Sequence, residues 1–219
     1  TGAALTAGAL TVTNGTAANL TTADAITYTV EVTPAADGPV SLEVPADAAQ
    51  SAAFNPNAAS NLASVTHDAT APAGHGVAWT TDPVNAGNMM AAGFGLSAAE
   101  VGAAYGYTIT SDGGAGSVTG AGTVASADQA VAGIDVAALP DGTLTLALTL
   151  TDPAGNAAPA VSDTVAKDTA LPGATVATAA ADPTNASPIV FSIVFSEPMT
   201  GAALTAGVLT VTNGTAANL

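Results

Sequence analysis

The stretch TLTLALTLT, residues 143–151, places a leucine at every second position between small or polar residues. In an extended chain, successive side chains point to opposite faces, so these leucines share one face. They are Leu144, Leu146, Leu148 and Leu150. Turn-forming pairs flank the stretch, Asp141-Gly142 before it and Gly155-Asn156 after it. We therefore predict a β-strand with one buried face, bounded by two turns.

The same alternation recurs along the chain. Residues 25–33 place Ile26, Tyr28, Val30 and Val32 on one face, and residues 39–44 do the same with Val40, Leu42 and Val44. Further strand candidates are residues 87–95, 104–110, 117–124 and 189–196, and the only helix-like stretch is residues 97–104. Several short strands per 100 residues or so, separated by regular turns, are typical of an antiparallel β-sandwich. The fold class that we predict is all-β.

A long repeat joins the two ends of the chain. Residues 1–20 read TGAALTAGALTVTNGTAANL, and residues 200–219 match them at 19 of 20 positions, with Val208 in place of Ala9. The second copy starts 199 residues after the first (200 − 1). Near-identity at a fixed period is the signature of a tandem array. We therefore expect the natural parent to be longer than this chain.

A weaker repeat divides this period in two. Asp68-Ala-Thr-Ala-Pro72 is echoed by Asp168-Thr-Ala-Leu-Pro172, 100 residues later (168 − 68), and Asp82-Pro83 is echoed by Asp182-Pro183 at the same offset. We infer two modules of about 100 residues in each 199-residue repeat. Residues 69–168 form a complete module, residues 1–68 the C-terminal part of the other type, and residues 169–219 its N-terminal part.

Composition excludes several classes of function. The chain has 219 residues, a formal net charge of −16, a single basic side chain (Lys167) and no cysteine. One lysine does not neutralise a phosphate track, which argues against nucleic-acid binding. Thiol chemistry and disulfides are excluded, and the apolar runs are too short to insert into a membrane. No phosphate-binding glycine loop or paired-carboxylate cleft can be argued, so we predict that the segment is not an enzyme.

Several motifs resemble bacterial immunoglobulin-like (Ig-like) repeats. In the incomplete module these are Phe191-Ser-Ile-Val-Phe-Ser-Glu-Pro198, Leu-Thr-Val-Thr-Asn-Gly at 10–15 and 209–214, Tyr28-Thr-Val and Asp37-Gly38. In the complete module they are Ala99-Glu100-Val-Gly, Tyr105-Gly-Tyr-Thr-Ile109, Gly133-Ile-Asp135 and Leu148-Thr-Leu-Thr-Asp-Pro-Ala-Gly-Asn156, and Lys167-Asp-Thr169 with Pro172 resembles a joint between modules. The resemblance implies tandem Ig-like sandwiches of a large secreted or cell-surface adhesin-type protein, often stiffened by calcium. The incomplete module departs from its family at Ser51-Ala-Ala-Phe54-Asn55, where Asp-x-x-Gly-Asn is expected.

On the topology that this resemblance implies, acidic residues gather where modules meet. The joint that enters the complete module would collect Asp68, Glu100, Asp152, Asn156, Asp37 and Asp182. The joint that enters the next module would collect Asp168, Glu197, Asp141 and Asp82. Hard oxygen ligands around a short linker suit calcium, which accepts six to eight oxygens. The alternative is that these residues are solvated turn and cap residues, the usual role of aspartate and asparagine in loops.

Other polar and aromatic residues favour structural roles. His67 and His75 flank the linker, but two histidines with no third nitrogen or sulfur ligand nearby are a weak case for zinc, so we expect exposed linker histidines. Trp79, Met89 and Met90 are expected to fill the core.

Three functions remain open. The first is an extended stalk outside a bacterial cell, in which each module contacts only its neighbours in the same chain. The second is the repeating unit of a laterally packed filament or surface layer, such as a biofilm fibre of identical chains. The third is a module that binds glycans or proteins, which predicts loops that vary between repeats; the near-invariant repeat disfavours it.

Overall fold

The computed structural model describes residues 4–200 and 204–217. They are almost entirely β-strand and loop, with two 3₁₀ turns, η1 (Ala7–Ala9) and η2 (Ala206–Val208). The chain divides into two compact units, Thr1–Lys167 and Asp168–Leu219. The strand pairings with a described register are antiparallel, as the alternating sequence predicts.

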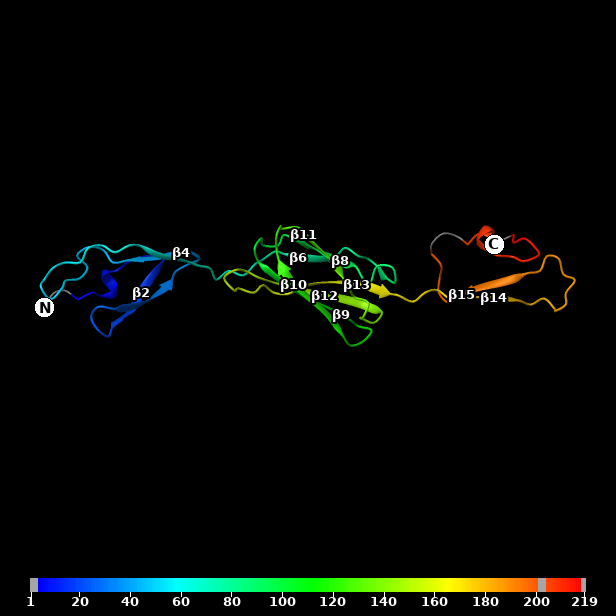
Figure 1. Ribbon diagram of the computed structural model, residues 1–219, viewed down its shortest axis with the longest axis horizontal. Helices are drawn as coiled ribbons and strands as arrows, with labels where there is room; N and C mark the ends of the chain where they lie inside the picture. The colour runs from blue at the N-terminus through cyan, green and yellow to red at the C-terminus, as the bar shows by residue number, and fades with distance from the viewer. Residues whose placement is uncertain (1–3, 201–203, 218–219) are drawn as a thin grey trace. The chain divides into compact units, whose positions relative to one another are not determined.

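Two sheets enclose the hydrophobic core of the first unit (Figure 1). The larger sheet has the order β10-β9-β12-β13-β7, and the smaller has the order β11-β8-β6. The strands of the larger sheet are β7 (Val84–Asn85), β9 (Ala104–Ser111), β10 (Ser117–Thr123), β12 (Gly142–Thr151) and β13 (Val161–Asp168). The strands of the smaller sheet are β6 (Gly76–Trp79), β8 (Ala92–Ser97) and β11 (Gln129–Ile134).

Strand β12 lies at the centre of this core, as its sequence predicts. Leu144, Leu146, Leu148 and Leu150 are all 0% exposed, and β12 pairs with β9 on one side and β13 on the other. Phe94 and Leu96 of β8 belong to the same cluster, so the inward faces of the two sheets meet. Phe94 packs edge-on against Tyr107, with ring centroids 5.1 Å apart.

The segments on either side of the complete module form smaller sheets. Residues before the linker give a sheet of order β1-β4-β5 and a hairpin β2-β3; the second unit gives the hairpin β14-β15. The strands are β1 (Thr11–Thr13), β2 (Gly15–Thr22), β3 (Tyr28–Pro34), β4 (Gly38–Glu43), β5 (Ala63–His67), β14 (Ala174–Thr178) and β15 (Phe191–Phe195).

Some local predictions are wrong. Only the second half of residues 87–95 is strand, because Asn88 and Met89 donate backbone hydrogen bonds to the Asn85 carbonyl and form a turn first. Residues 97–104 are not helical, because Ala98 adopts a left-handed conformation with φ 48°. Met90 is 68% exposed instead of filling the core, whereas Met89 and Trp79 pack against it. His75 is buried instead of exposed.

Candidate functional site

The linker that enters the complete module is bound by the turn before β4. The register of β4 and β5 pairs Gly38 with His67, which brings Asp37 to the start of the linker. Asp37 Oδ1 accepts a hydrogen bond of 2.8 Å from the Ala69 amide, and Asp37 Oδ2 accepts one from the Thr70 hydroxyl. His67 Nε2 lies 3.9 Å from Asp37 Oδ1. Asp37 therefore connects the last hairpin before the linker to the linker itself.

Asp68 shapes the linker locally. Its Oδ1 accepts a hydrogen bond of 3.0 Å from the Thr70 amide, two residues further along the chain. A carboxylate that caps the amide two residues on forms an Asx turn, which orders a short loop without any partner from elsewhere.

The hairpin after β12 reaches the same linker. Asp152 Oδ1 accepts from the Asn156 amide, and Asp152 Oδ2 accepts from Asn156 Nδ2, both at 2.8 Å. Asn156 Nδ2 also donates to the Asp68 carbonyl at 3.1 Å. Four of the predicted residues therefore meet around the linker, namely Asp37, Asp68, Asp152 and Asn156. We call them the first joint.

Hydrogen bonding controls the charge of two of these carboxylates. The hydrogen bonds from Thr70 and from the Ala69 amide lower the pKa of Asp37, and His67 lowers it further, whereas the charge of Asp152 opposes this. Burial raises the pKa of Asp152, but the bonds from the Asn156 side chain and from backbone amides outweigh it, and the net shift is downward. Both groups are therefore held ionised as hydrogen-bond acceptors.

The carboxylates of the first joint serve as hydrogen-bond acceptors. Both oxygens of Asp37 and both of Asp152 already accept hydrogen bonds from protein donors. Within residues 4–200 and 204–217, no three histidine, cysteine or acidic side chains lie together as a metal-binding group. Calcium binding, which takes six to eight oxygens, therefore stays a prediction at the first joint.

The structure places three of the other predicted ligands in the first unit. Glu100 is exposed in the turn before β9, and Asp82 is exposed between β6 and β7. Asp141 Oδ1 lies 3.9 Å from Lys167 Nζ. The remaining three belong to the second unit: Asp168, Asp182 and Glu197. The clustering predicted at the second joint therefore stays a prediction.

The ends of the two module types nevertheless share their local geometry. Gly142 pairs with Lys167 as Gly38 pairs with His67, so each Asp-Gly turn faces a lysine or a histidine at the end of the last strand. Asp141 to Lys167 and Asp37 to His67 are both 3.9 Å. Asp168 Oδ1 accepts from the Ala170 amide at 3.0 Å, which repeats the Asx turn of Asp68.

The final hairpins of the two module types are also alike. The Ser51 amide donates to the Asn55 carbonyl, and the Phe54 amide to the Ser51 carbonyl, as Asp152 and Gly155 do in the complete module. The Asn55 amide donates to Ser51 Oγ at 3.2 Å, where its counterpart Asn156 donates to Asp152. Serine therefore replaces aspartate as the acceptor without changing this turn.

Lys167 has a role that the sequence reasoning missed. Its side chain is 2% exposed, and its ammonium donates to the backbone carbonyls of Ala137, at 3.3 Å, and Leu139. It thereby ties the end of β13 to the loop before β12. The sequence contained a signal for a structural role of Lys167, because this one lysine of the chain directly precedes the linker residue Asp168.

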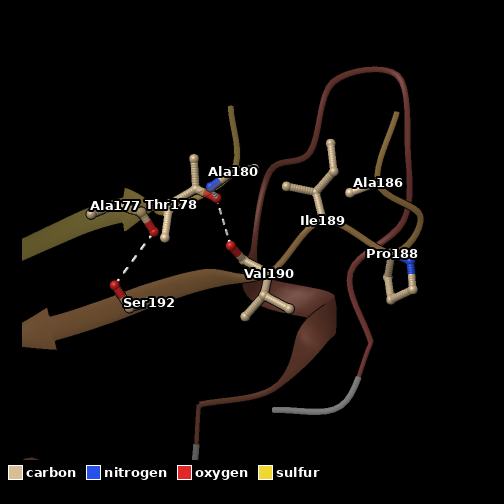
Figure 2. A pocket seen from close by; sticks show the side chains of 9 residues that line it. Ala177, Thr178, Ala180, Ala186, Pro188, Ile189, Val190 and Ser192 are labelled. Carbon is tan, nitrogen blue, oxygen red and sulfur yellow. Dashed lines mark hydrogen bonds between the residues drawn. The ribbon is translucent and has the colours of Figure 1, made fainter. Parts of the chain in front are cut away.

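A shallow hollow in the second unit lies between the ends of β14 and β15 (Figure 2). Thr178 Oγ1 donates to the Val190 carbonyl at 2.7 Å, and Ser192 Oγ donates to the Ala177 carbonyl at 3.4 Å. The rest of the lining is alanine, proline and aliphatic side chains, including Ile189. Its hydroxyls are bound to backbone carbonyls, and none of its nine lining residues carries a titratable side chain.

No family model matches this sequence, and no curated protein matches it. The part of the chain that the structure describes contains no helix long and apolar enough to cross a membrane. Among solved structures, the chain is similar to the crystal structure of a tetra-tandem repeat in the extending region of a large adhesion protein. The TM-score is 0.42 and the sequence identity 21%, and the match covers 83% of this chain and 55% of that chain. The chain thus spans about half the length of that structure.

Proposed function

We propose that this chain is a non-enzymatic structural segment of a long bacterial extracellular protein, in which Ig-like β-sandwich modules follow one another as an extended stalk. The observation that carries the proposal is the 19-of-20 match between residues 1–20 and 200–219. Repeats this similar favour a role in length or packing over a role in recognising individual ligands. In such arrays, length scales with the number of repeats.

The hydrogen-bonded joint supports a stiff connection between neighbouring modules. Asp37 and Asn156 both reach the linker, one from each side of it in sequence. A linker fixed by several side chains has fewer conformations than a free one, so it transmits extension better. The net charge of −16 adds repulsion that opposes compaction.

Calcium enters the proposal as a second way to stiffen a joint. Because the carboxylates of the first joint are engaged, we propose that hydrogen bonds alone hold it. Calcium stays a prediction for joints in the complete array, where the ligand set would include Asp168, Asp141, Asp82 and Glu197.

The test is small-angle X-ray scattering on chains of two, four and six repeats, each measured with calcium and with chelator. We expect the maximum dimension to increase in proportion to repeat number, with little change on chelation. Shortening on chelation would support calcium stiffening over hydrogen bonds. A maximum dimension that does not grow with repeat number would overturn the stalk. The double variant Asp37→Asn, Asp152→Asn should be more flexible, and Asp163→Asn, within β13 and paired with Leu146, is a matched acidic control outside the joints.

A laterally packed filament or surface layer of identical chains is the second candidate. The same near-identity of repeats favours it, because regular lateral contacts need identical surfaces. Electron microscopy of native material distinguishes the two: single thin fibres support the stalk, and bundles with a regular lateral spacing support the filament.

A further inference from the structure

An acidic residue lies on the inward face of the last strand of the complete module. Asp163 alternates along β13 with Val161 and Val165, both of which contact the hydrophobic core. It is half-buried and stands opposite Leu146 of β12 in the strand register. A carboxylate on an apolar face is unfavourable unless it is hydrogen-bonded. The Oδ2 atom of Asp163 accepts a hydrogen bond of 2.8 Å from the backbone amide of Trp79.

This hydrogen bond joins the first strand of the complete module to the last. Trp79 is the final residue of β6, which lies at the edge of the smaller sheet, whereas β13 belongs to the larger sheet. After Trp79 the chain crosses between the sheets and forms the two-residue strand β7 beside β13. Asp163 therefore holds the chain at the point where it leaves the smaller sheet. We call the hydrogen bond between Trp79 and Asp163 the terminal-strand contact.

Two successive amides at this crossing are bound on opposite sides of the chain. The Thr80 amide donates to the Gly93 carbonyl of β8 at 2.9 Å, so it points toward the partner strand of β6. Successive amides of an extended strand point to opposite sides, so the Trp79 amide points away from β8. Because β6 ends the strand order of the smaller sheet, the Asp163 carboxylate stands where a further strand would bind.

The chain enters and leaves the complete module at opposite ends of β12. At the entry, Asn156 in the hairpin after β12 donates to the carbonyl of the linker residue Asp68. At the exit, Lys167 near the end of β13 pairs with Gly142, the first residue of β12. The ten residues of β12 separate these ends by about 33 Å, at about 3.3 Å a residue. Tension on the two linkers therefore acts along β12.

Tension in this direction pulls β6 and β13 apart lengthwise. Gly76, the first residue of β6, pairs with Ser97, and the loop after Ser97 leads to Ala104. Ala104 pairs with Thr151, the last residue of β12, so β6 begins at the entry end. Because β13 ends at the exit, the two linkers pull these strands in opposite directions. The terminal-strand contact connects the two strands and is loaded directly.

We propose that the complete module bears tension, and that the terminal-strand contact has to break before the module opens. The hydrogen bonds between β6 and β8 are perpendicular to the strands, so a pull along the strands loads them together instead of one after another. The Asp163 carboxylate adds a bond from β6 to the opposite sheet, and hydrogen bonds to charged acceptors are stronger than those between neutral groups. The first strand is therefore held by both sheets.

Side chains at both ends pass the load into the module. At the entry, Asn156 connects the linker residue Asp68 to the hairpin between β12 and β13. At the exit, the Lys167 ammonium donates to the carbonyls of Ala137 and Leu139, which attaches the end of β13 to the loop before β12. The inference goes beyond the proposed stalk, because a stalk can be extended without carrying load. Scattering measures length and not load, so the two proposals fail separately.

The test is force spectroscopy of single 219-residue chains held by their two ends at constant load. Unfolding of residues 76–168, 93 residues in all (168 − 75), releases roughly 300 Å of chain and thereby identifies the complete module. Asp163→Ala removes the acceptor and should unfold about tenfold faster at the same load, the factor for one lost hydrogen bond to a charged group. Asp163→Asn keeps a neutral acceptor, so its unfolding rate should lie between those of Asp163→Ala and the unmodified chain.

The matched control is Asp128→Ala. Asp128 Oδ1 accepts a hydrogen bond of 3.3 Å from the Ala98 amide, a bond of the same kind that joins neither the first strand nor the last. Urea denaturation gives the equilibrium stability of each variant. The stability lost in Asp163→Ala should appear wholly as faster unfolding under load. Asp128→Ala should leave the unfolding rate under load within about twofold, because its contact is still intact when the module opens.

Two results would overturn the proposal. One is an Asp163→Ala module that unfolds under load at the rate of the unmodified chain. The other is equal acceleration by Asp163→Ala and Asp128→Ala for an equal loss of equilibrium stability, which would make the Asp163 bond an ordinary structural one. If the urea series shows that Asp163→Ala does not fold, Asp163→Asn is held to the same two criteria.

Discussion

Leu146 is the residue around which the complete module is packed. It is fully buried on β12, between Ile109 of β9 and Asp163 of β13 in the strand register. In an alanine-rich chain there are few large side chains to collapse into a gap. Truncation therefore leaves a cavity in addition to the lost burial.

We expect Leu146→Ala to lower the free energy of unfolding of the complete module by about 2–5 kcal/mol. Thr149→Ala, on the exposed side of the same strand, is the matched control and should change it by less than about 0.5 kcal/mol. Urea denaturation followed by tryptophan fluorescence of Trp79 measures both. Equal effects of the two substitutions would contradict the assignment of Leu146 to the core.

Asp37 and Asp152 couple stability to pH. The folded state lowers both pKa values, so each group stabilises the fold fully above its unfolded pKa of about 3.9. That stabilisation is lost as the pH falls through the lowered folded values. We expect the melting temperature to be flat from pH 7 to 5 and to fall below pH 4. In the double variant Asp37→Asn, Asp152→Asn the melting temperature at pH 7 should be lower by a few degrees and the acid dependence weaker; an unchanged acid dependence would contradict this linkage.

Lys167 stabilises the loop before β12 through its ammonium. Replacing it with methionine keeps most of the apolar stem but leaves the carbonyls of Ala137 and Leu139 without this donor. We expect Lys167→Met to lower the free energy of unfolding by about 1.5–3 kcal/mol, the range for hydrogen bonds to charged groups. Chemical denaturation measures it, and Lys167→Arg should recover part of the loss.

At the scale of elements, two glycines of β10 pair with two tyrosines of β9. Gly120 lies opposite Tyr107, and Gly122 lies opposite Tyr105. A Cβ on Gly120 would collide with the hydroxyl oxygen of Tyr107, and one on Gly122 would collide with that of Tyr105. The rings therefore lie across the strand where no side chain stands. This explains why β10 carries alternate glycines although glycine is unfavourable in strands.

We expect Gly120→Val to displace the Tyr107 ring and to lower the free energy of unfolding by about 1–3 kcal/mol, as overpacking does. Ala121→Val, whose side chain points to the other face of the same strand, should be neutral or stabilising because valine favours strands. Near-ultraviolet circular dichroism reports the tyrosine environment and should change only for Gly120→Val. A stable Gly120→Val protein with an unchanged tyrosine signal would contradict the packing.

At the scale of the whole molecule, the sequence contains a single peptide bond that trypsin can recognise, the one after Lys167. Lys167 is the only basic residue in the sequence, and it lies buried in β13, paired with Gly142. We expect the native chain to resist trypsin. Above the melting temperature of the complete module, mass spectrometry should find two fragments, residues 1–167 and 168–219. Cleavage of the native chain at a rate that does not depend on stability would contradict the buried position of Lys167.

The alternating segments predicted about half of the described strands directly, because a strand with one buried face carries its period in the sequence. Strands such as β11 (QAVAGI) and β5 (ASVTH) escaped prediction, since small and polar residues interrupt their apolar alternation and their pairing comes from neighbours. For the candidate site, the linker residue Asp68 and the hairpin residue Asn156 were predicted to lie at the same joint, and Asn156 donates a hydrogen bond to the Asp68 carbonyl. Their role as hydrogen-bonding groups could not be separated from calcium binding by residue type, because both use the same oxygens.

The repeated 20 residues distinguish the features that local sequence determines from those that tertiary structure determines. Both copies form the same 3₁₀ turn, and Asn14 and Asn213 adopt the same left-handed conformation, with φ 55° and 60°. These features depend on residues within a few positions, so the sequence alone determined them. Residues 11–13, however, form β1 against β4, whereas residues 210–212 are not strand. A β-strand takes its hydrogen bonds from a partner distant in the chain, so only the presence of that partner decided which copy became a strand.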